Sequence, residues 1–214
     1  MRILIEISFI LLAYLIGSIP IAVIVSKLFF KKDVREYGSK NMGATNATRV
    51  FGFKVGIVVF ILDAIKGGLL LGLFNFNIID RGLLPHIPLI TLGLAATIGH
   101  IFPIFAKFKG GKGVACTAGI LAFYNPLSFI IVLVIFFITA LITRYVSISS
   151  IILILSAFIL SFFIPPINQS TPDLYYIIYC GLLLIVLILT HRKNIVRLIQ
   201  GNESKITKDF FKGK

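Results

Sequence analysis

Three polar segments of the chain hold residues whose types and spacing suit the binding of phosphate. The first, at 38–49, places hydrogen-bonding side chains among two glycines; the candidates are Ser39, Asn41, Asn46 and Arg49. Glycine lets backbone N–H groups approach an anion, amides and hydroxyls add neutral donors, and a guanidinium can offer phosphate a bidentate fork. We expect this segment to bind an anion, and an ordinary polar loop is the alternative.

The second segment, KFKGGKG at 107–113, sets lysines among glycines just before an apolar stretch. Backbone amides, a helix N-terminus and lysines together form a phosphate cradle, with these candidates: Lys109, Gly110, Gly111, Lys112 and Gly113. The spacing is not that of a nucleotide-hydrolysing P-loop. Such a loop has Ser or Thr directly after its lysine, whereas Gly113 and then Val114 follow Lys112 here. The alternative is a flexible basic turn that serves as a topology signal.

The third segment, at 191–203, begins where the last apolar run ends. His191 and Asn194 are three residues apart, which puts them on one face if this stretch is helical. The alternative is an interfacial helix whose basic side chains reach toward the lipid headgroups.

A few polar residues lie inside or beside the apolar runs. Asp63 and Lys66 are three residues apart, and each unpaired charge at such depth costs at least about 2.5 kcal/mol. They either neutralise each other and fix the packing, or Lys66 is directed toward an anionic ligand. We expect His100 to be a packing residue. Ser149 is most simply a helix N-cap and can also donate to a bound phosphate.

The elements that must position these residues are membrane helices. The chain of 214 residues is 58% hydrophobic and 14% charged, whereas soluble domains carry about 25% charge. Apolar runs recur along its whole length, which excludes a soluble core, disorder, collagen and coiled coil. Its two cysteines lie in apolar runs, so we expect no disulfide framework, no metal site and no redox cofactor.

A membrane span needs about 20 apolar residues. This length predicts an all-α polytopic protein, a single domain over 1–214, with seven transmembrane helices near 3–25, 55–74, 88–105, 113–124, 127–143, 147–164 and 174–190. The segment at 113–124 is short, and we interpret it as a helix rather than a re-entrant piece. The first run has no signal-peptide cleavage pattern and is expected to be retained.

The basic residues predict the orientation. Of the 21 Lys and Arg, only Arg2 and Arg81 fall on one face, and Lys66 lies within a span. By the positive-inside rule the N-terminus is outside and the C-terminus is cytoplasmic. The net charge of +13 is then a topology signal rather than a sign of nucleic-acid binding. All three polar segments therefore share the cytoplasmic face.

Anion-competent segments on one face of a helical bundle favour an enzyme that acts on lipid phosphates, with two phosphate sites. The detailed pattern resembles the bacterial acyl-phosphate:glycerol-3-phosphate acyltransferases, the PlsY family. Seven stretches carry the resemblance in order along nearly the whole chain: GSIP at 17–20, GSKNMGATNATR at 38–49, LDAIKG at 62–67, GH at 99–100, KFKGGKGVA at 107–115, RYVSISS at 144–150 and HRKNIVRLIQGNE at 191–203. Two positions depart from the family pattern: Lys40 stands where glycine is expected and Cys116 where threonine is expected.

The resemblance implies a seven-span enzyme of the bacterial inner (plasma) membrane, with its active site facing the cytoplasm. It would transfer a fatty acyl group from acyl phosphate to position 1 of glycerol 3-phosphate, giving lysophosphatidic acid and inorganic phosphate. It assigns the acceptor side to Ser39, Arg49, Lys112, His191 and Asn194, and the backbone of 110–113 to acyl phosphate. The expected partners are these substrates and membrane lipid, without nucleic acid or metal, and a monomer is compatible with them.

Two points stay open at this stage. A transporter of a phosphorylated metabolite is the alternative from another class, and it would need midplane polar residues in two related halves, which the sequence lacks. A transferase for other sugar or alcohol phosphates is a further alternative. The proton of the attacking hydroxyl goes either to His191 or to the substrate's own phosphate. We favour the phosphate, because no carboxylate in the third segment is placed to orient His191.

Overall fold

The computed structural model describes residues 1–212, and within that range every secondary-structure element is a helix. The chain forms two compact units, one of Met1–Phe123 with the segment that begins at Lys208, and one of Tyr124–Thr207. The predicted all-α class is therefore confirmed for the described residues. The single domain over 1–214 stays a prediction.

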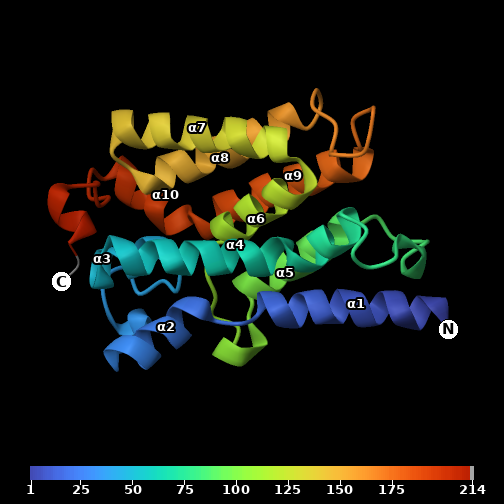
Figure 1. Ribbon diagram of the computed structural model, residues 1–214. Coiled ribbons are helices and arrows are strands. Elements are labelled where there is room, and N and C mark those ends of the chain that lie inside the picture. Colours follow the sequence, from blue (N-terminus) through green and yellow to red (C-terminus); the bar gives the residue numbers. More distant parts are fainter. Residues whose placement is uncertain (213–214) are drawn as a thin grey trace. The chain divides into compact units, whose positions relative to one another are not determined.

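The first unit is built on the long helix α4 (Phe53–Asn75), which packs with α1 (Arg2–Gly17) and α5 (Ile90–Ile101), as Figure 1 shows. Glycines allow the close approach of α1 and α5, because a Cβ at Gly17 would overlap the backbone of Ala96. Small residues at helix contacts are the usual means of close packing within a membrane. The unit also contains α2 (Ile21–Phe30), α3 (Ala44–Phe51), α6 (Val114–Tyr124) and four short 3₁₀ helices: η1 (Val34–Glu36), η2 (Arg81–Leu83), η3 (Ile104–Ala106) and η4 (Lys208–Phe211).

One continuous helix was predicted over 3–25, but the first apolar run forms two helices. Helix α1 ends at Gly17 and α2 begins at Ile21, after Pro20. Proline has no N–H to donate and its ring clashes with the preceding turn, so it interrupts the helical hydrogen bonds. The break leaves the Ile19 carbonyl between the two helices.

The second unit consists of α7 (Pro126–Thr143), α8 (Val146–Leu160), α9 (Leu174–Thr190) and α10 (Arg192–Ile199), with α7 beside α8 and α8 beside α9 (Figure 1). Asn125 begins α7 by accepting the Ser128 N–H at 3.1 Å, and Pro126 occupies the first helical position, which suits it. The axes of α9 and α10 differ by 57°.

Each predicted span contains a helix, but their lengths differ. Three stretches in the described residues are long and apolar enough to cross a membrane: Arg2–Phe30, Phe53–Asn75 and Pro126–Thr143. The bent pair α9 and α10 makes up to four, and the remaining apolar helices are shorter. Helix α6, with 11 residues, measures about 16 Å at 1.5 Å per residue, about half of the hydrocarbon thickness. Seven full spans therefore stay a prediction.

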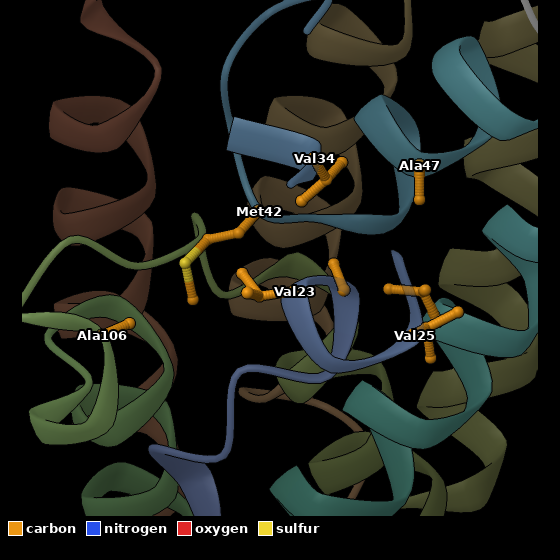
Figure 2. Close-up of a cluster of buried hydrophobic side chains, with 8 residues drawn as sticks. Val23, Val25, Val34, Met42, Ala47 and Ala106 are labelled. Atoms are coloured by element: carbon orange, nitrogen blue, oxygen red, sulfur yellow. The ribbon is translucent and has the colours of Figure 1, made fainter. Parts of the chain in front are cut away.

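A cluster of buried apolar side chains, here called the loop cluster, lies under the polar loops of the first unit (Figure 2). It joins α2 and α3 to the loops at Val34 and Met42 and to Ala106, which directly precedes the lysine and glycine segment. Its buried members are Ala22, Val23, Val25, Val34, Met42, Ala47, Val59 and Ala106. The cluster therefore brings the first and second polar segments to the same end of this unit.

Candidate active site

Asn46 determines the shape of the first polar loop. Its Nδ2 donates to the carbonyls of Val34 and Tyr37 at 3.0 and 3.1 Å, and its Oδ1 accepts the Ser39 N–H at 2.8 Å. Only this orientation of the amide satisfies all three groups, and the side chain is 1% exposed. Gly38, with φ +58°, passes so close that a Cβ there would overlap Asn46 Oδ1. The structure thus gives Asn46 a role in the loop, while its direct contact with substrate stays a prediction.

An ion pair fixes the start of the same loop. Asp33 accepts from the Arg35 side chain at 2.9 and 2.7 Å and from the Arg35 N–H at 3.0 Å. The hydrogen bonds from Arg35 outweigh the effect of burial and hold the pKa of the Asp33 carboxyl well below its usual range. The carboxylate is therefore ionised at neutral pH and keeps η1 in place.

The other candidates of the first segment lie toward the surface. Ser39 is exposed, Asn41 is half-buried, and Arg49 is half-buried in the last turn of α3. The Arg49 guanidinium carbon lies 5.8 Å from the centre of the Phe210 ring, so the C-terminal segment packs beside it. Arginine keeps its planar fork when it packs against an aromatic ring in this way.

The glycine loop, residues 110–113, leads directly into α6, as the sequence predicts. The Gly111 N–H donates to the His100 carbonyl at 3.1 Å, and the Thr117 N–H donates to the Gly113 carbonyl as α6 begins. A Cβ at Gly110 would overlap the His100 carbonyl, and Gly113 has φ +92°. The glycines are therefore needed for close backbone approach and for the left-handed turn. Backbone N–H groups at a helix N-terminus can donate hydrogen bonds to an anion.

Beneath the glycine loop lies a buried charged cluster. Lys66 Nζ is 2.7 Å from Asp63 Oδ1 and donates to the Ile19 carbonyl at 2.6 Å, and His100 Nδ1 lies 3.6 Å from the same Asp63 oxygen. Of the two interpretations of Lys66, the structure shows the ion pair with Asp63. A contact of Lys66 with substrate stays a prediction.

The third segment lies in the second unit, at the junction of α9 and α10. His191 is 2% exposed, and its Nδ1 is 2.9 Å from the Leu187 carbonyl. Because a carbonyl only accepts, this contact places a proton on Nδ1 and makes Nε2 the acceptor of the neutral ring. The Leu187 carbonyl thus helps to orient the imidazole.

Glu203 organises the rest of the third segment. Its two oxygens accept from Asn194 Nδ2 at 2.6 Å and from Arg197 Nε at 2.7 Å. Burial raises the pKa of the Glu203 carboxyl, but the hydrogen bonds from Asn194 and Arg197 outweigh it and hold that pKa below its usual value. The ionised Glu203 therefore fixes the side chain of Asn194.

Ser149 is not an N-cap, and that prediction is wrong. Helix α8 begins at Val146 after Tyr145, so Ser149 lies inside its first turn. From there its hydroxyl reaches back to the Tyr145 carbonyl at 3.0 Å, which is the usual bond of a serine within a helix. Ser149 is fully buried, and its donation to a bound phosphate stays a prediction.

Comparison with known proteins identifies the family. The sequence model described as glycerol-3-phosphate acyltransferase matches residues 7–201. This chain belongs to the glycerol-3-phosphate acyltransferase family. The Bacillus subtilis (strain 168) protein of that name is 47% identical over 92% of this chain and 95% of its own length. Glycerol-3-phosphate acyltransferase 2 of Bacillus anthracis is 43% identical over 92% of this chain and 96% of its own.

Solved structures agree with this membership. The crystal structure of PlsY (YgiH), described as an integral membrane glycerol 3-phosphate acyltransferase in its glycerol 3-phosphate form, has a TM-score of 0.83 and 33% identity, and the match covers 94% of this chain and 96% of that one. Its lysophosphatidic acid form has a TM-score of 0.81 at the same identity. The chain is therefore an acyltransferase and an integral membrane protein.

The two departures from the PlsY pattern now have structural settings. Lys40 has φ +59°, a left-handed conformation in which glycine is the less strained residue. Cys116 is fully buried and donates to the Asp63 carbonyl at 3.3 Å. It faces α4 and does not add a hydroxyl to the glycine loop.

Sequence reasoning predicted the three polar segments but missed two groups that the structure places beside them, Glu203 and His100. The sequence could have indicated the role of Glu203, because it is the only carboxylate in the stretch 191–203. No sequence feature could have indicated the contact of His100 with the glycine loop, since this contact depends on how α5 and the loop fold together. Residues 1–212 hold no group of three or more side chains suited to a metal ion.

Proposed function

We propose that this acyltransferase moves a fatty acyl group from acyl phosphate to the sn-1 hydroxyl of glycerol 3-phosphate. The products are lysophosphatidic acid and inorganic phosphate, and the reaction is the first acylation of bacterial phospholipid synthesis. One observation carries the proposal beyond family membership. Met42 of the first polar segment and Ala106, which directly precedes the second, pack in the same loop cluster, so the two anion-competent segments approach each other there.

The two segments suit the two anionic substrates. The backbone of 110–113, with Lys109, would hold the phosphate of the donor at the start of α6, through N–H groups other than that of Gly111, which donates to the His100 carbonyl. Ser39, Arg49 and Lys112 would bind the phosphate of glycerol 3-phosphate, with the guanidinium fork on two of its oxygens. Asn41 adds a donor beside Ser39. An acyl chain anchored in the bilayer gains about 0.8 kcal/mol for each buried CH₂.

The reaction needs alignment more than strong acid or base. The acceptor hydroxyl oxygen forms a bond to the acyl carbonyl carbon, and the bond from that carbon to the phosphate oxygen breaks. Inorganic phosphate leaves with the bonding electron pair, and the hydroxyl proton is removed. Positive groups that cancel the repulsion between two phosphates, and hold the hydroxyl near the carbonyl, supply most of the acceleration.

We propose that a phosphate oxygen of the substrate takes the proton, and that His191 and Asn194 serve the acceptor. The Leu187 carbonyl helps to orient the His191 ring. The test is His191→Asn, which keeps a hydrogen-bonding group and cannot titrate. We expect a raised KM for glycerol 3-phosphate with substantial kcat. A kcat lowered by about 10³-fold or more, with loss of the acid limb, would make His191 the base.

The function is tested with purified protein in detergent. Palmitoyl phosphate and glycerol 3-phosphate are added together and singly, and release of inorganic phosphate is followed. We expect release only when both substrates are present, together with formation of lysophosphatidic acid. Palmitoyl-CoA replaces palmitoyl phosphate in a parallel reaction. Equal turnover with both donors would refute the assignment of acyl phosphate.

We further propose that seven spans place the N-terminus outside the plasma membrane of a bacterial cell and the active site on the cytoplasmic side. The test compares Lys109→Cys with Gln169→Cys, both at exposed positions, while the native Cys116 and Cys180 are fully buried. An impermeant thiol reagent applied to intact cells should label Gln169→Cys alone. Labelling of Lys109→Cys alone would reverse the orientation.

A further inference from the structure

The buried charged cluster links three helical segments of the first unit. Lys66 on α4 contacts the Ile19 carbonyl, which the break between α1 and α2 leaves exposed to it, and also pairs with Asp63 on the same helix. Asp63 in turn faces His100, near the end of α5. All three side chains are more than nine-tenths buried.

Packing alone is a costly reason to keep this cluster. Each charge placed within the membrane carries a large desolvation cost, and a hydrophobic set of similar volume would avoid that cost. Ionisable residues at such depth are more often kept for function. The contact between His100 and the glycine loop indicates what that function is.

His100 contacts the glycine loop through both its ring and its backbone carbonyl. A Cβ at Gly111 would overlap His100 Nε2, so the ring lies against the Gly111 backbone. The His100 carbonyl accepts the Gly111 N–H at 3.1 Å and leaves no room for a Cβ at Gly110. The ring and the carbonyl of one residue therefore support the two glycines that directly precede Lys112.

We propose that His100 is a positioning residue for the donor phosphate, held in place by Asp63 and Lys66. It keeps the backbone of 110–113 in the shape in which the N–H groups other than that of Gly111 are presented to acyl phosphate. The inference rests on the proposed function, because it assigns the glycine loop to the donor. Its consequence is selective: disturbing His100 weakens binding of the donor and leaves the acceptor loop, which Asn46 shapes separately, unchanged.

The kinetic test compares His100→Ala with His86→Ala, a matched control whose side chain is 62% exposed near η2. His100→Ala should raise the KM for palmitoyl phosphate about tenfold, with kcat at saturation and the KM for glycerol 3-phosphate within about twofold of wild type. His100→Gln, which keeps an amide in place of the ring nitrogens, should recover part of the loss. An unchanged KM for palmitoyl phosphate in folded His100→Ala, or an equal rise in both KM values, overturns the inference.

A second measurement does not depend on turnover. Lys109→Cys carries a nitroxide label beside the glycine loop, and its motion is read by electron paramagnetic resonance. Adding His100→Ala should mobilise the label, whereas adding His86→Ala should not. If wild-type protein fails to use palmitoyl phosphate, the proposed function fails, and the label still reports whether His100 supports the loop. Unchanged motion with His100→Ala overturns the inference.

A third variant approaches the same contact from the loop and serves if His100→Ala does not fold. Gly111→Ala places a methyl group where His100 Nε2 lies, so it should mobilise the label and raise the KM for palmitoyl phosphate about tenfold. The double variant Gly111→Ala with His100→Ala should be no worse than either single one, because both remove the same contact. Independent effects that multiply to about a hundredfold would contradict the proposal.

Discussion

Replacing Asn46 by alanine tests whether this residue builds the first polar loop. The substitution removes the donor to the carbonyls of Val34 and Tyr37 and the acceptor for the Ser39 N–H. Because Asn46 is buried, water cannot easily replace these bonds. The loop should then lose the shape that presents Ser39.

The expected size of the effect follows from these three hydrogen bonds. Each contributes about 1 kcal/mol net, so Asn46→Ala should cost about 3 kcal/mol of stability. The Val34 side chain is fully buried in the loop cluster, which will keep part of the loop in place. We therefore expect a folded protein of lower stability, with a KM for glycerol 3-phosphate raised about tenfold.

The assay uses the two native cysteines. Cys116 and Cys180 are fully buried, so a thiol-reactive dye reports their exposure as the detergent-solubilised protein is heated. Asn202→Ala, at an exposed position with no proposed contact to substrate, is the matched control and should leave both stability and KM unchanged. A wild-type melting curve together with a wild-type KM for Asn46→Ala would refute the reasoning.

Three further variants address single groups. Arg49→Lys keeps the charge but loses the bidentate fork, so steady-state kinetics should show a KM for glycerol 3-phosphate raised about tenfold or more; an unchanged KM would remove Arg49 from the acceptor site. Lys40→Gly relieves a left-handed residue at φ +59° and should raise stability by about 1 kcal/mol in the thiol assay, whereas a loss would show that the lysine side chain matters more. Glu203 has a lowered pKa in the folded state, so its stabilisation is complete above the unfolded value of about 4.3 and is lost as pH falls through the folded pKa. Glu203→Gln should therefore be less stable at neutral pH and lose that acid-side dependence; an unchanged pH profile of stability would contradict this role.

The helices and their membrane character could be read from the sequence because both depend on local composition. Runs of apolar residues predicted the positions of α4, α7 and α9 closely, and the lysine and glycine spacing predicted that a loop opens α6. The continuous helix over 3–25 was wrong. Pro20 was visible in the sequence, but whether a proline bends or breaks a helix depends on what donates to the freed carbonyl, here Lys66 to Ile19.

The sequence by itself determined that this is an all-helical membrane protein with three polar segments rich in phosphate-binding groups, because residue type and periodicity carry that information. That it is an acyltransferase followed from its resemblance to a known family. Only the tertiary structure decided which contacts the buried polar side chains near these segments make. Lys66 pairs with Asp63 and reaches Ile19, 47 residues away in the chain, and His100 occupies the space that a side chain at Gly111 would need. Such contacts join residues far apart in sequence, and their geometry arises only when the helices pack.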